Sequence, residues 1–165
     1  MVAQTRERLL DDHHAVSEVL KQLLTALDNK DVETSYARLD LLWARLAVHI
    51  RAEHLHLFPA VTARAPQLSE AIVENLRDDH DFFMRELAQA IRTLREANDL
   101  AAVTDTVREI EKRLATHNEI EETQIYRWSS TILTEPEQLE LLAKINGELE
   151  NRPPRFSEEA WANTL

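Results

Sequence analysis

Two histidine–glutamate pairs in this sequence have the residue types and the spacing of a metal site. In each pair the glutamate follows the histidine by four residues: Glu53 follows His49, and Glu121 follows His117. On a helix, residues four apart project from the same face, here in line with a stripe of aliphatic residues. A polar group on such a stripe costs free energy unless something satisfies it. The two pairs therefore need a partner in the interior.

Two further histidines, His13 and His80, lie in the same way on other predicted helices. A lone histidine on an apolar face is usually a hydrogen-bonded core residue, but four of them with two glutamates need another explanation. Two buried carboxylates close together oppose both ionisation and folding, and cations between them remove both penalties. The sequence therefore predicts a pair of metal ions among these six side chains.

The donor atoms narrow the choice of metal. The sequence has no cysteine, which excludes thiolate zinc sites and cysteine-held iron–sulfur clusters. Four histidine nitrogens and two carboxylates suit two ions bridged by the carboxylates, with room for an oxo, hydroxo or water ligand. Nitrogen and carboxylate ligation with open positions favours iron or manganese. Zinc is an alternative, although it usually takes fewer ligands per ion.

Four amphipathic helices must position these side chains. The predicted helices are one over residues 4–27, one ending near Phe58-Pro59, one capped by Ser69 and closed by Asn98-Asp99, and one whose apolar seam runs from Val103 to Ile125. The chain has one glycine and five prolines, which favours long helices with short polar links. We therefore predict an all-α fold, an antiparallel up-down-up-down four-helix bundle.

A shorter fifth helix is predicted to follow the bundle. Thr134-Glu135-Pro136-Glu137 has the pattern of a capping box with proline in the first turn, and Gly147 marks the expected end of the helix. Residues 157–161 are expected to add a last helical turn. We expect the bundle over residues 1–130, and a C-terminal helix and tail packed on it over residues 131–165.

An internal repeat relates the two halves of the bundle. Asp11-Asp12-His13 returns 67 residues later as Asp78-Asp79-His80, and the H-x-x-x-E pair returns after 68 residues. Leu57-Phe58 matches Ile125-Tyr126 at the same distance. Two similar helical hairpins are therefore expected, each with one histidine on its first helix and a histidine and a glutamate on its second.

This order of motifs resembles the hemerythrin-like, or HHE cation-binding, domain family over roughly residues 9–127. The resemblance implies a non-haem di-iron centre in which the two glutamates bridge the irons, and its ligands are His13, His49, Glu53, His80, His117 and Glu121. The family often has a second acidic residue beside the ligand glutamate. Glu122 keeps that residue, and His54 replaces it in the first repeat.

Two departures separate the sequence from the oxygen-carrying hemerythrins. Their third helix has H-x-x-x-H, whereas here Met84 follows His80 by four residues. Their fourth helix places its carboxylate five residues after the histidine, whereas Glu121 follows His117 by four. Fewer nitrogens leave extra open coordination, which argues against simple reversible oxygen carriage.

The other histidines have weaker assignments. His14 is turned towards the flank of its helix, and His54 is expected off the apolar stripe. Glu53-x-x-His56 matches the E-x-x-H element of ferritin-like di-iron bundles, but that fold needs a second such element and the sequence has none. For His56, two roles stay open: an extra metal ligand, or a residue at the mouth of a channel. Phe83 is expected to wall the metal pocket.

Charge and hydropathy limit the partners. A formal net charge of -11 argues against nucleic acid or an anionic membrane surface. The first residues lack the apolar core of a signal peptide, and no run approaches the ~20 apolar residues needed to span a bilayer. We therefore expect a cytoplasmic location, and the oligomeric state stays open.

Three functions compete at this point. The first is a di-iron protein that binds or reduces a small oxidant such as dioxygen, peroxide or nitric oxide. The second is a non-catalytic iron sensor or store whose metal state controls a protein partner. The third is a metal-free helical interaction module. Hydrolases and nucleotide enzymes are set aside because no nucleophile triad or glycine-rich phosphate loop is present.

Overall fold

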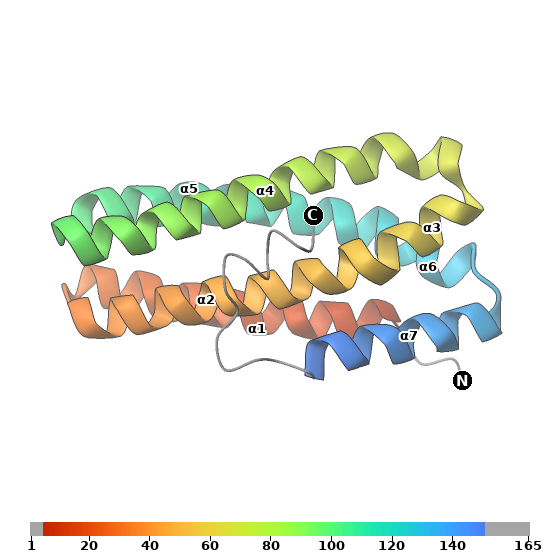
Figure 1. Cartoon of the computed structure of the whole chain (residues 1–165), viewed down its shortest axis with the longest axis horizontal. Helices are drawn as coiled ribbons and strands as arrows, with labels where there is room; N and C mark the ends of the chain where they lie inside the picture. Colours follow the sequence, from red (N-terminus) through yellow and green to blue (C-terminus); the bar gives the residue numbers. More distant parts are fainter. Residues whose placement is uncertain (1–4, 151–165) are drawn as a thin grey trace.

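Long helices form the whole of the described chain. The structure is a computed structural model that describes residues 5–150 (Figure 1). Its elements are α1 (Thr5–Asp28), α2 (Val32–Ala52), the π-helical turn η1 (Glu53–Leu57), α3 (Phe58–Arg64), α4 (Pro66–Ala97), α5 (Leu100–Ile120), the π-helical turn η2 (Glu121–Ile125), α6 (Tyr126–Thr131) and α7 (Glu135–Glu150). The predicted all-α architecture is confirmed. The last helical turn and the tail expected after residue 150 lie outside the described residues.

The bundle consists of two antiparallel hairpins, α1 with α2 and α4 with α5, whose turns lie at the same end (Figure 1). The two turns are built alike. Lys30 (φ 57°) and Asn98 (φ 52°) adopt the left-handed conformation, and the residue after each caps the next helix. Asp31 accepts a hydrogen bond from the backbone N–H of Thr34, and Asp99 accepts one from that of Ala102. The sequence repeat thus extends into the turns.

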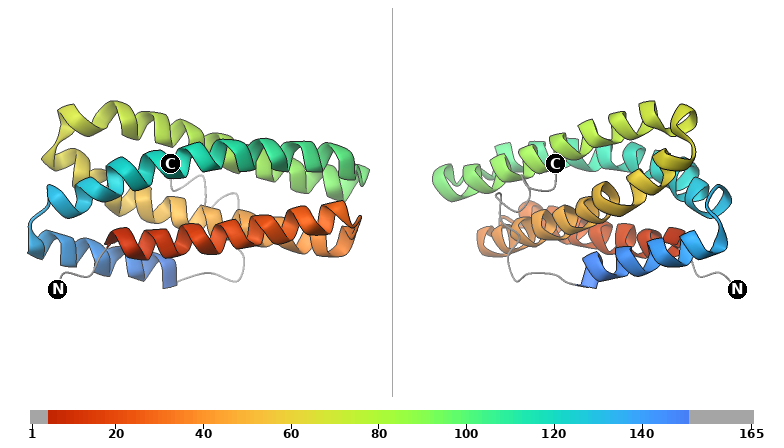
Figure 2. Two further views of the ribbon diagram at one scale, coloured as in Figure 1. Left: turned by 180° about the vertical axis from the view of Figure 1, so that it is seen from behind. Right: turned by 45° about the vertical axis from the view of Figure 1, so that its right-hand side comes forward.

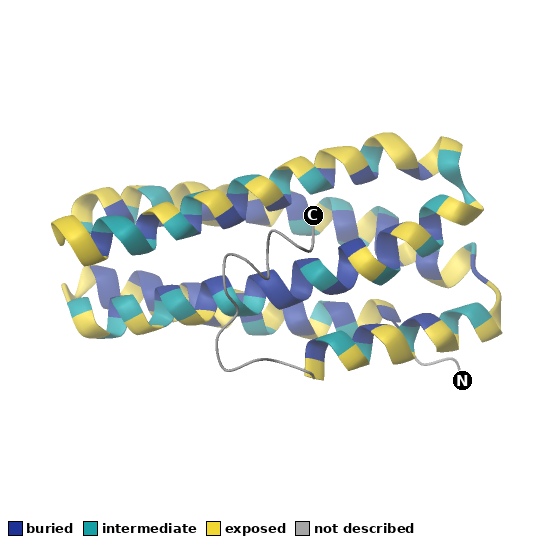
Figure 3. Ribbon diagram, viewed as in Figure 1, coloured by how far each residue is buried: buried dark blue, intermediate teal, exposed yellow. Residues whose placement is uncertain are grey.

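The core runs along the whole bundle. Each long helix turns one face inward, and the buried residues follow that face while the exposed ones cover the outside (Figure 3). Fully buried aliphatic side chains such as Leu9, Leu23, Leu39, Leu87 and Val107 fill the interior between the hairpins. Their burial removes a large apolar area from water, which favours this packing of amphipathic helices. The six polar candidates must therefore sit in a hydrophobic surrounding.

The second predicted helix does not end at Phe58-Pro59. It passes through the π-helical turn η1 and continues as α3 to Arg64, and the break falls at Ala65. In η1 the backbone N–H of Phe58 donates to the carbonyl of Glu53, five residues earlier. This wider turn directly before the proline relieves the clash between its ring and the preceding turn. The second hairpin repeats the arrangement, with η2 leading into α6.

Two predicted helix ends are also corrected. Ser69 is not the N-cap of α4 but lies in its first turn, where its hydroxyl donates to the carbonyl of Ala65. Gly147 does not end α7, which continues to Glu150 because Leu149 is buried and holds the last turn against the bundle. The capping box is confirmed, since Thr134 and Glu137 exchange hydrogen bonds through their backbone N–H groups and side chains.

Helix α7 packs on the first hairpin. It lies along α1, α2 and η1, as the views from both sides show (Figure 2). Leu141 and Ile145 are buried on its inner face. Glu148 pairs with Arg51 at 2.9 Å and with His56 at 3.2 Å. None of the helices in residues 5–150 is long and apolar enough to cross a membrane.

Candidate metal centre

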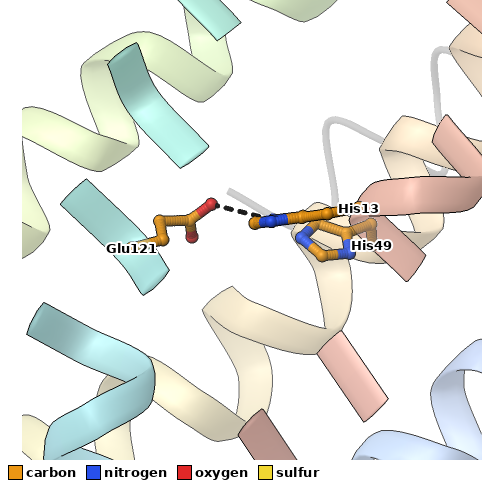
Figure 4. A group of neighbouring side chains, drawn as sticks. All are labelled: His13, His49 and Glu121. Atoms are coloured by element: carbon orange, nitrogen blue, oxygen red, sulfur yellow. Dashed lines mark ion pairs between the residues drawn. The ribbon is translucent and has the colours of Figure 1, made fainter. Parts of the chain in front are cut away.

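The four helices bring all six predicted site residues together in the middle of the bundle. Each of them is at most 4% exposed: His13 on α1, His49 on α2, Glu53 in η1, His80 on α4, His117 on α5 and Glu121 in η2. Figure 4 shows three of these side chains converging, with the Glu121 carboxylate facing the His13 ring. The juxtaposition joins residues more than a hundred positions apart in the sequence.

The Nε2 atoms of the four histidines approach the two carboxylates. Glu121 Oε1 lies 2.9 Å from His117 Nε2 and 3.4 Å from His13 Nε2. Glu53 Oε1 lies 3.3 Å from His49 Nε2 and 3.4 Å from His80 Nε2. Each carboxylate thus faces one imidazole from each hairpin.

These donors form two groups that can each hold a metal ion. One consists of His13, His49 and Glu121, the other of His80, His117 and Glu121, and within each group the ligand atoms lie within 4.8 Å of one another. Glu121 belongs to both groups. Glu53 belongs to neither, although its Oε1 lies close to an imidazole of each.

The polar atoms at the centre fit bound cations better than they fit one another. Glu53 Oε1 and both carboxylate oxygens of Glu121 are buried and have no well-aligned hydrogen bond from the described residues, although imidazole nitrogens lie 2.9 to 3.4 Å from Glu53 Oε1 and Glu121 Oε1. His80 Nε2 and His117 Nε2 are 3.0 Å apart, and at most one proton can lie between them. Orphaned buried oxygens and facing nitrogens are costly in an apolar interior. Cations between these donors would compensate both.

The outer ring nitrogens are held by a second set of side chains. The Nδ1 atoms of His49 and His117 are hydrogen-bonded to aspartates, Asp12 at 2.9 Å and Asp79 at 3.1 Å. Each aspartate directly precedes a site histidine in the repeated Asp-Asp-His motif. Such partners fix the ring so that Nε2 faces the metal. The repeat of this motif is visible in the sequence, but the sequence alone predicted no role for its aspartates.

The other two histidines differ in their Nδ1 partners. His13 Nδ1 lies 2.9 Å from a carboxylate oxygen of Glu122, whereas His80 Nδ1 lies 2.8 Å from His54 Nε2. The expectation that His54 lies off the apolar stripe is wrong, because its side chain is buried. The π-helical turn has more residues per turn than an α-helix, and the change of phase brings both Glu53 and His54 inward.

An aromatic residue follows each π-helical turn and contacts the site. The hydroxyl of Tyr126 donates to Glu53 Oε2 at 2.9 Å and lies 2.8 Å from His13 Nε2 and 3.3 Å from His49 Nε2. Phe58, at the equivalent position of the repeat, stacks parallel on the ring of His80 with the centroids 5.8 Å apart. One aromatic residue brings an oxygen into the site and the other brings none.

The centre therefore has two halves of different composition, each with imidazoles from one hairpin and neighbours from the other. The tyrosine half contains His13, His49, Glu122 and Tyr126. The phenylalanine half contains His80, His117, His54 and Phe58. Glu53 and Glu121 lie between the two halves.

The electrostatics of the buried groups follow from their neighbours. Burial on its own would lower the pKa of His49 and of His117, but the glutamate four residues on and the aspartate at Nδ1 outweigh it. The pKa of His117 is raised to about 9, and that of His49 lies well above its ordinary 6.5. Burial lowers the pKa of His80. Metal binding at His49 and His117 would therefore compete with protons.

The remaining predicted residues take other places. His56 belongs to neither group of donors and pairs with Glu148 of α7, while His14 is exposed, as expected. Phe83 is fully buried and meets the ring of His117 edge-on at 5.2 Å, so it walls the pocket as expected.

Comparison with known proteins gives one match. The family model of the hemerythrin HHE cation binding domain matches residues 4–129, which include all six predicted ligands and both π-helical turns. Neither a search of curated proteins nor one of solved structures found a match. With this match over most of its length and a buried His/Glu cluster able to hold metal, the chain belongs to the hemerythrin HHE cation-binding domain family.

Proposed function

We propose that this chain holds a non-haem di-iron centre that binds or reduces a small oxidant such as dioxygen, peroxide or nitric oxide. The observation that carries the proposal is the pair of three-donor groups that share Glu121 and have two imidazoles each. Three protein donors are fewer than iron usually takes, so each ion keeps positions for a small ligand. The proposed ligands are His13, His49, Glu53, His80, His117 and Glu121.

Iron is the preferred metal because the donors are imidazole and carboxylate with positions to spare. Manganese suits the same donors, and zinc would be satisfied by fewer. Two bound irons would supply electrons and Lewis acidity for the reduction of an oxidant. The side chains of the protein orient the ligands, hold a proton and exclude water.

Those side chains orient the donors, hold a proton and limit water. Asp12 and Asp79 orient two of the imidazoles through Nδ1. In the metal-free site the hydroxyl of Tyr126 carries a proton that it donates to Glu53 Oε2, so this proton is held inside the site until metal binds. Phe58 and Phe83 cover the rings of His80 and His117 with apolar surface, which keeps water away from the phenylalanine half.

A surface cavity lies beside the phenylalanine half. This cavity of about 270 Å³ between α3 and α4 is lined by Phe58, Val73 and Arg77, among others. The Phe58 ring stacks on the ring of His80, and the guanidinium of Arg77 lies 5.7 Å from the centroid of the Phe58 ring. We propose that movement of the Phe58 side chain lets a diatomic ligand or peroxide pass from this cavity towards the donors.

The experiment is anaerobic reconstitution of the metal-free chain with ferrous iron, a count of ions per chain, and exposure to each oxidant. We expect two irons per chain and, after oxidation, the near-ultraviolet charge-transfer absorption of a coupled ferric pair. The His49→Ala, His117→Ala double variant should lose both, while His14→Ala, at an exposed position, should behave as the parent. A featureless spectrum at full loading would contradict the proposal.

An iron sensor or store is the second candidate. It is favoured by the buried oxygens of Glu53 and Glu121, which the neighbouring imidazoles compensate only in part without metal ions, so that bound metal would add to the stability of the fold. A sensor would show a large metal-dependent change in stability or association with no oxidant turnover. Measuring thermal stability and oxidant consumption on the same loaded sample separates the two functions.

A further inference from the structure

The two halves of the centre differ in charge around their imidazoles. In the tyrosine half, His13 Nδ1 has a carboxylate partner, Glu122, at 2.9 Å. In the phenylalanine half the equivalent partner of His80 is His54, which brings no negative charge. A carboxylate hydrogen-bonded to a ligand imidazole raises its basicity and favours a bound cation.

A second difference in charge also makes the phenylalanine half less negative than the tyrosine half. Asp79, behind His117, also receives two contacts of 2.8 Å from the guanidinium of Arg113, which neutralises its charge. The side chain of Asp79 is 21% exposed, whereas that of Asp12, behind His49, is 3% exposed. The field of a partly exposed carboxylate is screened more than that of a buried one. The phenylalanine half is therefore less attractive to a cation.

The third difference is a donor atom. The Tyr126 oxygen lies 2.8 to 3.3 Å from His13 Nε2, His49 Nε2 and Glu53 Oε2. Two ligands at right angles, each about 2.1 Å from one ion, are separated by about 3 Å. The phenol oxygen thus stands at the spacing of a further ligand beside the two imidazoles. Phe58 has no polar atom at the equivalent place in the other half.

We propose that the two metal positions are unequal, and that Tyr126 is a protein ligand of the ion held by His13 and His49. This ion is bound more tightly and has fewer positions for other ligands, while the ion held by His80 and His117 is bound more weakly and is lost first. A stable one-ion form exists between the empty and the full centre, and a second kind of metal can enter the phenylalanine half. The inference rests on the proposed function only for the presence of two ions.

The test is an anaerobic calorimetric titration of the metal-free full-length chain with ferrous iron. The expected result is two steps of one ion per chain each, with dissociation constants separated by about ten- to a hundredfold. Tyr126→Phe should weaken the first step and bring the two constants together. Phe58→Tyr should tighten the second step, and it tests the inference without removing any existing group from the site.

A matched control is available because the chain has only two tyrosines. Tyr36 lies on α2 against the core and contacts none of the site residues in the hydrogen bonds or ring contacts of the described chain. Tyr36→Phe should leave both steps unchanged. In the ferric protein, a phenolate ligand formed by proton release to solvent gives a visible charge-transfer band, which should vanish in Tyr126→Phe and persist in Tyr36→Phe.

The outcomes separate the inference from the proposed function. Two steps of equal affinity, with no visible band and no effect of either aromatic substitution, would overturn the inequality and leave the di-iron centre standing. Absence of any binding at the site would overturn the proposed function and this inference with it. A visible band that survives Tyr126→Phe in a folded variant would overturn the role of the tyrosine.

Discussion

The tyrosine half and the phenylalanine half of the centre come from equivalent positions of one repeat, yet they offer a metal ion different surroundings. Their histidines repeat in the sequence at offsets of 67 and 68 residues. The turns that join the two helices of each hairpin also repeat, at Lys30 and Asn98. The differences lie in the partners, among them Glu122 against His54 and Tyr126 against Phe58. A repeated scaffold thus keeps two ligand sets in place while their neighbours set the chemistry of each.

The two hairpins differ on the outside as well. Helix α7 packs on α1, α2 and η1, and its Glu148 reaches Arg51 and His56 beside the first π-helical turn. The main contacts of α7 are with α1, α2 and η1, and η2 of the second hairpin is not among them. The turn that carries Glu53 and His54 is therefore supported from outside by α7.

The largest effect is expected from the residue that both halves share. Glu121→Gln removes the charge of the one carboxylate common to both groups of donors, so both ions should be lost. The stabilisation by metal, about 2.7 kcal/mol for each ion at a hundredfold excess over its dissociation constant, should disappear. Metal analysis and thermal unfolding with and without iron measure both. Glu119→Gln, at an exposed position near the end of α5, is the control.

If Glu121→Gln instead kept one ion, the bound ion would identify the half that does not need this carboxylate. Retention of two ions would contradict the shared-ligand arrangement.

The next effect concerns the support given by α7. Ile145→Ala removes a fully buried side chain and should lower the free energy of unfolding by about 2 to 5 kcal/mol. Amide hydrogen exchange should accelerate in α7 and η1 more than in η2, because α7 contacts η1. Leu139→Ala, on the exposed face of α7, is the matched control with little expected change. Equal acceleration in both π-helical turns would show that α7 does not distinguish the hairpins.

Exchanging the charged partners should move the affinities of the two positions in opposite directions. His54→Glu gives His80 a carboxylate partner and should tighten the weaker position about tenfold or more, whereas Glu122→His should loosen the tighter one by a similar factor. The two-step titration described above measures each. A ratio of dissociation constants that neither exchange alters would show that these partners do not set the inequality.

The smallest effect is expected at the start of α7. Thr134→Ala removes the N-cap hydroxyl and should cost about 1 kcal/mol. The backbone N–H of Thr134, then Arg64 and the threonine hydroxyl, hold the pKa of Glu137 below its ordinary 4.5. A carboxylate with a lowered pKa in the folded state stabilises above pH 4.5, and this stabilisation is lost as the pH falls through the folded pKa.

The difference in melting temperature between the metal-free parent and Glu137→Gln should therefore be present at pH 7 and shrink below pH 4.5. Glu135→Gln, in the same first turn but outside the pair of residues that form the capping box, is the control. A difference that stays constant down to pH 3 would exclude the carboxylate as its source.

Much of the architecture follows from local rules. Apolar residues in steps of three and four predicted every long helix, and the capping box of Thr134 and Glu137 predicted the start of α7. Two of the errors fell at the π-helical turn η1. A π-helical turn has no simple periodicity in the sequence, so the passage through Pro59 was missed, and so was the inward turn of His54.

The sequence by itself determined the six polar residues on the apolar faces, since burying them without cations is too costly and their spacing is that of one helix face. Only the tertiary structure decided which of them meet across the hairpins and which partners hold their outer nitrogens. Asp12, Asp79, Glu122 and Tyr126 lie far from their histidines in sequence. Their roles depend on how the four helices are rotated against one another, and that rotation is set by packing of the entire core.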